Sequence, residues 1–259
     1  MQNDTAKSGS LNSISGIPWG APVLLSLCVI PFGWAGLLAP ATWLALTGIE
    51  LNNGWKRGVL FIVCAFLMLL AGFNVIPGSD RLQLVAPYTD SDGNLIYASF
   101  NSGKAIIAIA LLAFMLRLRQ TIRIADLPFL FLAILIPVAS GFFLYGPSLK
   151  LDPTIALAAL INLLVVCISE EGFFRWIFQR GIAEILSNWQ WLSVPIVAFV
   201  FAFLHVGWSA GSAAIFLLGI ASLCYAMLWF MRSNFWLCVL AHWGVNLLHM
   251  FTLPYPLPS

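Results

Sequence analysis

Apolar stretches of membrane-spanning length recur along almost the whole chain. They cover about residues 19–47, 58–76, 104–116, 127–146, 153–186, 191–206, 211–231 and 234–252. A helix needs about 20 apolar residues to cross hydrocarbon, and it satisfies its own backbone hydrogen bonds there. The pattern therefore predicts an all-α fold, a polytopic transmembrane helical bundle with about eight spans. Pro31, Gly33 and Pro40 interrupt the first stretch, which is either one long broken span or a span with a re-entrant piece.

The charge content excludes a soluble protein. Only 8% of the residues are charged and 61% are hydrophobic, whereas a soluble domain carries about 25% charged residues. No basic run is long enough to form a phosphate-binding patch. We therefore expect an integral, multi-pass protein of the cell (inner) membrane, with the lipid bilayer as a partner and no nucleic acid.

The polar segments divide the chain into a tail and one membrane domain. Residues 1–18 are predicted to be a polar N-terminal tail, and residues 19–254 a multi-pass membrane domain. Within that domain the longest polar stretch, about residues 77–103, is typical of an external loop. Most Lys and Arg residues, including Arg117, Arg119 and Arg123, fall on the other side of the predicted spans. The positive-inside rule makes that side cytoplasmic, and with eight spans both termini lie opposite to it.

Two carboxylates and a guanidinium interrupt the apolar run that begins at Pro153. They are Glu170, Glu171 and Arg175, and each charge at the centre of a spanning helix costs roughly 3 kcal/mol. Glu171 and Arg175 are four residues apart and can form a structural ion pair on one helix face. Glu170 points about 100° away around the helix and has no local partner. An unpaired carboxylate at this depth indicates a functional site.

The C-terminal half places further polar side chains in apolar helices. His205 ends the predicted sixth span, and His242 and Asn246 lie four residues apart on one face of the last span. Single polar residues in spanning helices often form interhelical hydrogen bonds, and we expect this role for Asn162 and His249. That explanation is hard to extend to Glu170, His205, His242 and Asn246 together, because burying these four side chains in three apolar helices costs too much for packing alone.

Glu170, His205, His242 and Asn246 together favour hydrolysis inside the membrane. A carboxylate and an imidazole that face one water molecule can remove its proton and orient it, which is the role predicted for Glu170 and His205. His242 and Asn246 offer an N–H and an amide NH₂ one turn apart. Two such donors suit a developing oxyanion, at roughly 3–4 kcal/mol per donor.

These residues and their order resemble the CPBP family of intramembrane proteases, which includes CAAX prenyl endopeptidases and bacterial proteins linked to bacteriocin self-immunity. The motifs are Glu170-Glu171-x-x-x-Arg175, Phe201-x-x-x-His205 and His242-x-x-x-Asn246, in a catalytic core at about residues 150–252. The resemblance implies an endopeptidase that acts on a membrane-associated peptide or protein. It also implies that the first Glu and the second-motif His activate water, and that the third-motif His and Asn form the oxyanion hole. The second Glu and the Arg would be structural or orient the substrate.

Several alternatives stay open at the level of sequence. Glu170, His205 and His242 could supply three zinc ligands with an open fourth position, although no His-Glu-x-x-His motif is present. The resemblance implies a metal-free mechanism without a cofactor. A proton-coupled transporter is a second possible function, but the sequence shows no internal repeat of the kind many carriers have. A non-catalytic peptide-binding membrane protein is a third. Nothing in the sequence identifies the substrate or says whether it is prenylated.

Overall fold

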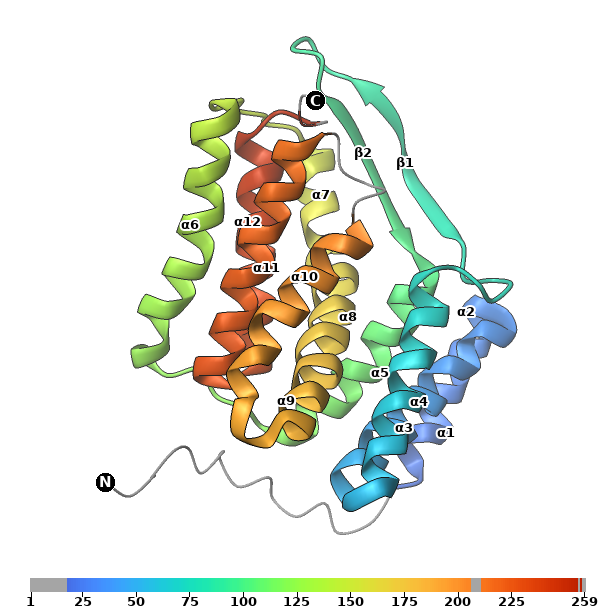
Figure 1. Ribbon diagram of the computed structural model, residues 1–259. Helices are drawn as coiled ribbons and strands as arrows, with labels where there is room; N and C mark the ends of the chain where they lie inside the picture. The colour runs from blue at the N-terminus through green and yellow to red at the C-terminus, as the bar shows by residue number, and fades with distance from the viewer. Residues whose placement is uncertain (1–17, 206–210, 256, 258–259) are drawn as a thin grey trace.

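The protein is a helical bundle with one β-hairpin at its end (Figure 1). The computed structural model describes residues 18–205, 211–255 and 257, so all but the last residue of the predicted tail at 1–18 lies outside it. The helices are α1 (Gly20–Leu25), α2 (Val29–Phe32), α3 (Leu38–Leu51), α4 (Gly54–Gly72), α5 (Ser102–Leu118), α6 (Leu127–Tyr145), α7 (Pro153–Ile161), α8 (Ile168–Glu171), α9 (Arg180–Leu186), α10 (Ser193–His205), α11 (Ser212–Arg232) and α12 (Phe235–Thr252). The strands are β1 (Arg81–Thr89) and β2 (Leu95–Asn101).

The described residues contain six helical stretches long and apolar enough to cross a membrane, rather than the predicted eight. The bundle is all-α and polytopic as predicted, and most helix bounds fall within a few residues of the expected ones. The difference in number has two causes. The predicted spans at 153–186 and 191–206 belong to one continuous helical stretch, Pro153–His205. The predicted span at 104–116 corresponds to α5, whose 17 residues extend only about 26 Å at 1.5 Å per residue, against about 30 Å of hydrocarbon.

The first apolar stretch turns back on itself, which favours the re-entrant alternative. Gly33 has φ +58° between α2 and α3, a conformation that glycine adopts without strain. A Cβ at Gly36 would lie 2.3 Å from the backbone of Cys28, so only glycine allows the two segments to approach this closely. The described chain therefore enters at the same end of the bundle where α3 ends (Figure 1). This placement contradicts the prediction that the N-terminal side lies opposite to the basic end.

The polar stretch predicted as a loop at about 77–103 contains the β-hairpin. β1 and β2 pair antiparallel from Arg81↔Asn101 to Thr89↔Leu95. The turn is held by Asp90, whose Oδ1 accepts a hydrogen bond from the backbone N–H of Asn94 at 2.8 Å. At the same end the Tyr88 hydroxyl donates to Asp152 at 2.7 Å, which ties the hairpin to the start of α7. That hydrogen bond holds the pKa of the Asp152 carboxyl below its usual value.

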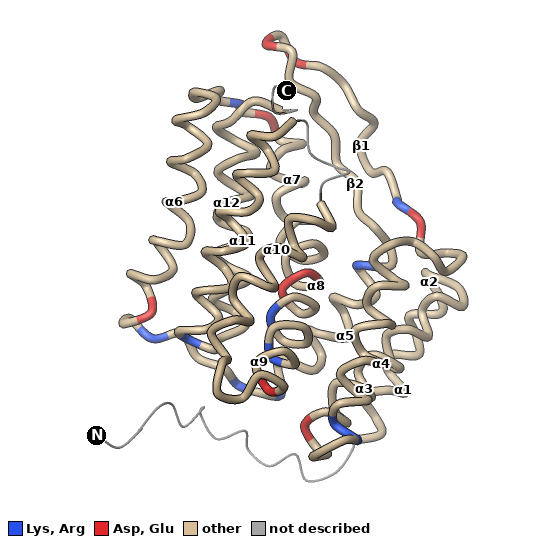
Figure 2. Tube along the Cα trace, viewed as in Figure 1, with Lys and Arg blue, Asp and Glu red and all other residues tan. Residues whose placement is uncertain are grey.

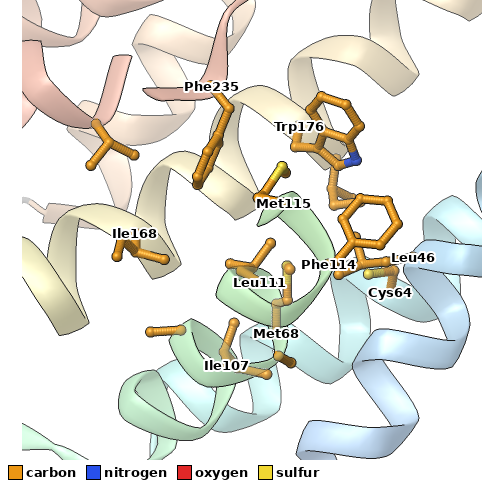
Figure 3. Close-up of a cluster of buried hydrophobic side chains, with 14 of the residues drawn as sticks. Leu46, Cys64, Met68, Ile107, Leu111, Phe114, Met115, Ile168, Trp176 and Phe235 are labelled. Carbon is orange, nitrogen blue, oxygen red and sulfur yellow. The ribbon is translucent and has the colours of Figure 1, made fainter. Parts of the chain in front are cut away.

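Helix α5 passes through the centre of the apolar core. Leu111, Phe114 and Met115 of α5 are buried between the N-terminal helices and the segment that carries Ile168 and Trp176 (Figure 3). Two glycines permit this packing. A Cβ at Gly103 would lie 2.1 Å from the Ala71 carbonyl oxygen, and one at Gly172 would lie 2.2 Å from Leu111 Cδ1. Close contact at both points fixes the height of α5 against its neighbours.

Cationic side chains gather at the end of the bundle opposite the hairpin (Figure 2). Arg57 donates to Glu184 at 2.8 Å, and Arg180 donates to Glu50 at 2.6 Å. These pairs join the N-terminal helices α3 and α4 to α9. The hairpin end therefore lies opposite the end that the positive-inside rule assigns to the cytoplasm.

Candidate active site

The predicted catalytic helix is continuous but irregular around the two glutamates. Asp152 caps its start by accepting a hydrogen bond from the Thr154 N–H at 2.7 Å, as the Asp-Pro sequence predicts. The helix ends at Ser187, which has φ +35°. Between these points, π-helical segments at Asn162–Cys167 and Gly172–Gln179 flank α8. Each π-helical turn shifts the faces of the residues that follow it. The faces of Glu170 and Glu171 relative to the start of the helix therefore do not follow an ideal 3.6-residue period, although Glu171 and Arg175 still pair across four residues.

Glu170 is buried, with 8% of its surface exposed. Its Oε1 atom accepts a hydrogen bond from Lys104 Nζ at 2.6 Å. Its Oε2 atom faces two imidazoles, at 3.8 Å from His205 Nε2 and 4.0 Å from His242 Nε2. These last distances are too long for direct hydrogen bonds. They leave Oε2 and the two ring nitrogens facing a common space.

His205 is held by its own helix. Its Nδ1 lies 2.7 Å from the carbonyl oxygen of Phe201, so Nδ1 carries the proton and donates it. In the neutral ring this leaves Nε2 as an acceptor on the side of Glu170. The Phe201 ring stacks on the imidazole with centroids 4.3 Å apart and an interplanar angle of 19°. The second motif therefore orients its histidine with both a backbone and a ring contact.

His242 is held by the second glutamate. Its Nδ1 lies 2.8 Å from Glu171 Oε1, and its ring stacks on Tyr225 with centroids 5.0 Å apart. The other oxygen, Glu171 Oε2, accepts from Arg175 Nε at 2.9 Å. The predicted ion pair between Glu171 and Arg175 is thus present and fully buried. Arg175 Nη1 continues the chain of contacts to Gln179 at 3.2 Å.

Asn246 is oriented by Asn162, whose interhelical role agrees with the prediction. Asn246 Nδ2 donates to Asn162 Oδ1 at 3.0 Å, and the Cys167 thiol donates to the same oxygen at 3.1 Å. This bond uses one of the two amide hydrogens of Asn246 and leaves the other for the cavity. The His249 imidazole hydrogen-bonds with the backbone of Pro254 just beyond its own helix, rather than with another helix as expected, and its Nε2 is buried without a partner among the described residues.

The four predicted catalytic side chains meet at one cavity of about 580 Å³. Glu170, His205, His242 and Asn246 all line it, and it extends from them toward the hairpin end, where β2 and Tyr255 form its wall. Glu170 and His205 reach it from different helices, with Oε2 and Nε2 3.8 Å apart. An aqueous reaction at this depth needs such a cavity.

Lys104 was not among the predicted site residues, although it contacts Glu170 more closely than any of them does. Lys104 lies in the first turn of α5, where the Asn101 side chain caps the helix by accepting from the Lys104 N–H at 2.8 Å. Only its position at the start of an apolar run could have drawn attention to it. Its proximity to Glu170, 66 residues further along the chain, depends on the packing of α5 against α8.

The residues considered as zinc ligands fit a metal poorly. In the described part of the chain, no group of three or more His, Cys, Asp or Glu side chains is arranged to hold a metal ion. The Lys104 ammonium already lies 2.6 Å from Glu170, and it would repel a divalent cation bound to that carboxylate.

Comparison with known families supports the motif-based prediction. Residues 152–248 match the sequence model of the family described as type II CAAX prenyl endopeptidase Rce1-like. No curated protein and no solved structure matches the chain. The match contains all three motifs, and the six apolar stretches make the protein an integral, multi-pass membrane protein. Residues 152–248 thus match the Rce1-like family of CAAX-type proteases, which supports the predicted CPBP/CAAX family and implies a peptidase.

Proposed function

We propose that the protein is an intramembrane endopeptidase in which Glu170 and His205 activate a water molecule. The observation that carries the proposal is the placement of Glu170 Oε2 opposite His205 Nε2, 3.8 Å apart, in a cavity within the bundle. Two acceptors at this separation can each receive one hydrogen of the same water. Its lone pair then points away from both, toward a substrate carbonyl, while Glu170 takes the proton.

His242 and Asn246 are suited to stabilise the tetrahedral intermediate. The free amide hydrogen of Asn246 is one donor to the oxyanion. The second is His242 Nε2–H, which requires a ring protonated at both nitrogens, with Nδ1–H donated to Glu171. Donors held in advance by other side chains need no reorganisation during the reaction, and one such donor contributes about 3–4 kcal/mol in a known case.

In this proposal the reaction uses no metal and no cofactor. Water supplies the nucleophile, and the proton taken by Glu170 is later given to the leaving amine. Because Lys104 supplies the positive charge beside the carboxylate, we expect chelators to leave activity unchanged. The substrate is a membrane-associated peptide or protein.

The cavity extends toward the hairpin end, opposite the cluster of cations (Figure 2). The positive-inside rule places that cluster in the cytoplasm. The charge distribution therefore supports a cavity that opens on the non-cytoplasmic side, and a substrate segment presented from there.

The test is cleavage of a mixture of internally quenched peptides by the purified protein in lipid nanodiscs. Glu170→Ala and His205→Ala should abolish cleavage, because each removes one of the two acceptors for water. Cys64→Ala is the control: Cys64 is fully buried in α4 and does not line the cavity, so cleavage should persist. Full cleavage by Glu170→Ala would refute the proposal, and loss of activity in EDTA would refute its metal-free form.

A further inference from the structure

β2 forms a long wall of the cavity. Residues 95–97 and 99–101 all line it. Successive residues of a strand point to opposite faces, so a cavity that touched one face would contact only alternate residues. Contact with consecutive residues places the edge of the strand along the cavity. Figure 1 shows β2 between β1 and the helices, with β1 on its outer side.

Among the described residues, the backbone edge of β2 that faces the cavity is hydrogen-bonded to another segment only at Leu95. Within the described chain, β2 pairs with no strand other than β1. The Leu95 N–H points away from β1 and donates to the Tyr255 carbonyl at 2.9 Å. Both register shifts leave the extra residues on β1, so β2 alternates regularly. By that alternation, the N–H groups of Tyr97 and Ser99 also point away from β1.

The strand leads directly to the catalytic glutamate. β2 ends at Asn101, which caps α5, and Lys104 in the first turn of α5 contacts Glu170 at 2.6 Å. The seven residues of β2 extend about 23 Å at about 3.3 Å per residue. A peptide paired along this edge would therefore run from the hairpin end of the cavity toward Glu170 Oε2.

A peptide bond can be attacked only when the backbone around it is not in a helix. Beside the apolar side chains that line much of the cavity, its exposed N–H and C=O groups then lack partners, at a cost of several kcal/mol. The free edge of a strand supplies such partners irrespective of sequence. We propose that β2 binds the substrate as an extended strand and delivers its scissile bond to Glu170, which deepens the proposed function and rests on it.

The experiment measures binding rather than cleavage, in full-length Glu170→Gln protein in nanodiscs. The probe is a fluorescein-labelled octapeptide of alternating Val and Thr. Ser99→Pro removes one N–H group that points away from β1, and an edge strand tolerates proline at such a position. Ser99→Ala keeps this N–H group. Both variants lose the Ser99 hydroxyl that binds Arg81. We expect Ser99→Pro to raise the Kd about fivefold over Ser99→Ala, as for one lost hydrogen bond.

A second series leaves the protein otherwise unchanged and so does not depend on how Ser99→Pro folds. Octapeptides N-methylated at one position each should lose affinity at every second position, since alternate N–H groups of a paired strand face its partner. Equal Kd values for the two Ser99 variants with equal thermal stability, uniform effects of N-methylation, or no binding would each overturn the inference. If N-methylation weakens binding at every second position but the wild-type protein cleaves no peptide, then strand binding is supported and the proposed function is refuted.

Discussion

Replacing Lys104 tests whether the site depends on a cation from outside the matched domain. Lys104→Met removes the ammonium from Glu170 Oε1, 2.6 Å away, and leaves the carboxylate, which is 9% exposed in its side chain, without this partner. A hydrogen bond between charged groups contributes about 1.5–3 kcal/mol. We take this range because the Lys104 side chain is 27% exposed, so the larger penalty of a fully buried pair does not apply.

The same range sets the expected loss of activity. If the misplaced carboxylate loses that much transition-state stabilisation, kcat/KM falls about 10- to 100-fold, since 1.36 kcal/mol is a factor of ten. Lys104→Arg keeps the charge and should recover part of the rate. Lys56→Met is the control, because it removes an exposed lysine at the end of the bundle opposite the hairpin. It should change neither the rate of cleavage nor the free energy of unfolding. The assay is the initial rate of peptide cleavage in nanodiscs over a range of substrate concentrations.

A double-mutant cycle separates the direct contact from a general effect on folding. Lys104→Met should lower the free energy of unfolding in the wild-type background by at least about 1 kcal/mol more than in a Glu170→Gln background, because the charge to which it binds is then gone. Equal effects in both backgrounds would show that the two side chains are not coupled. Unchanged kcat/KM in Lys104→Met would refute the argument that Lys104 positions the Glu170 carboxylate.

Two further predictions concern packing and orientation. Gly172→Ala should destabilise the protein by about 1–3 kcal/mol, because the new methyl group meets Leu111. Gly219 lies in the middle of α11 with open space around it, so Gly219→Ala should stabilise the protein by up to about 1 kcal/mol. The measurement is the thermal unfolding midpoint of each variant. Equal midpoints for the two variants would contradict the packing argument. A membrane-impermeant maleimide should label Ser91→Cys, in the hairpin turn, in intact cells but should not label Arg119→Cys, and the reverse pattern would place the cavity on the cytoplasmic side.

Local sequence signals predicted most of the helix bounds correctly. Asp152 and Pro153 marked a helix start, and the cap is present. The length of the apolar runs determined α6, α11 and α12 to within about two residues. The span count failed where two apolar runs are joined. The predicted fifth and sixth spans lie in one continuous helical stretch, Pro153–His205, and hydropathy alone does not show that helix continues between two apolar runs.

The candidate site was predictable in its residues but not in its contacts. The motifs identify Glu170, His205, His242 and Asn246, because charged and polar groups in apolar helices are costly and therefore conspicuous. Lys104 was missed because it looks like an ordinary cation at the end of a span. The hairpin was missed because a polar stretch with Asp and Gly residues is equally compatible with an irregular loop. Both features depend on contacts between distant parts of the chain.

The two adjacent glutamates differ in which oxygens remain available, and this difference assigns their roles. Glu171 is fully buried, and both of its oxygens are engaged, one by Arg175 at 2.9 Å and one by His242 at 2.8 Å. It has no free oxygen with which to accept a proton from water. Glu170 has one oxygen bound to Lys104 and the other directed at the cavity. A carboxylate with one oxygen bound to a cation and the other oxygen free can act as the base. Its neighbour, with both oxygens engaged, can only orient the imidazole. Hydrogen bonding, rather than the sequence motif, therefore distinguishes the glutamate that we propose as the base from the one that we propose as its support.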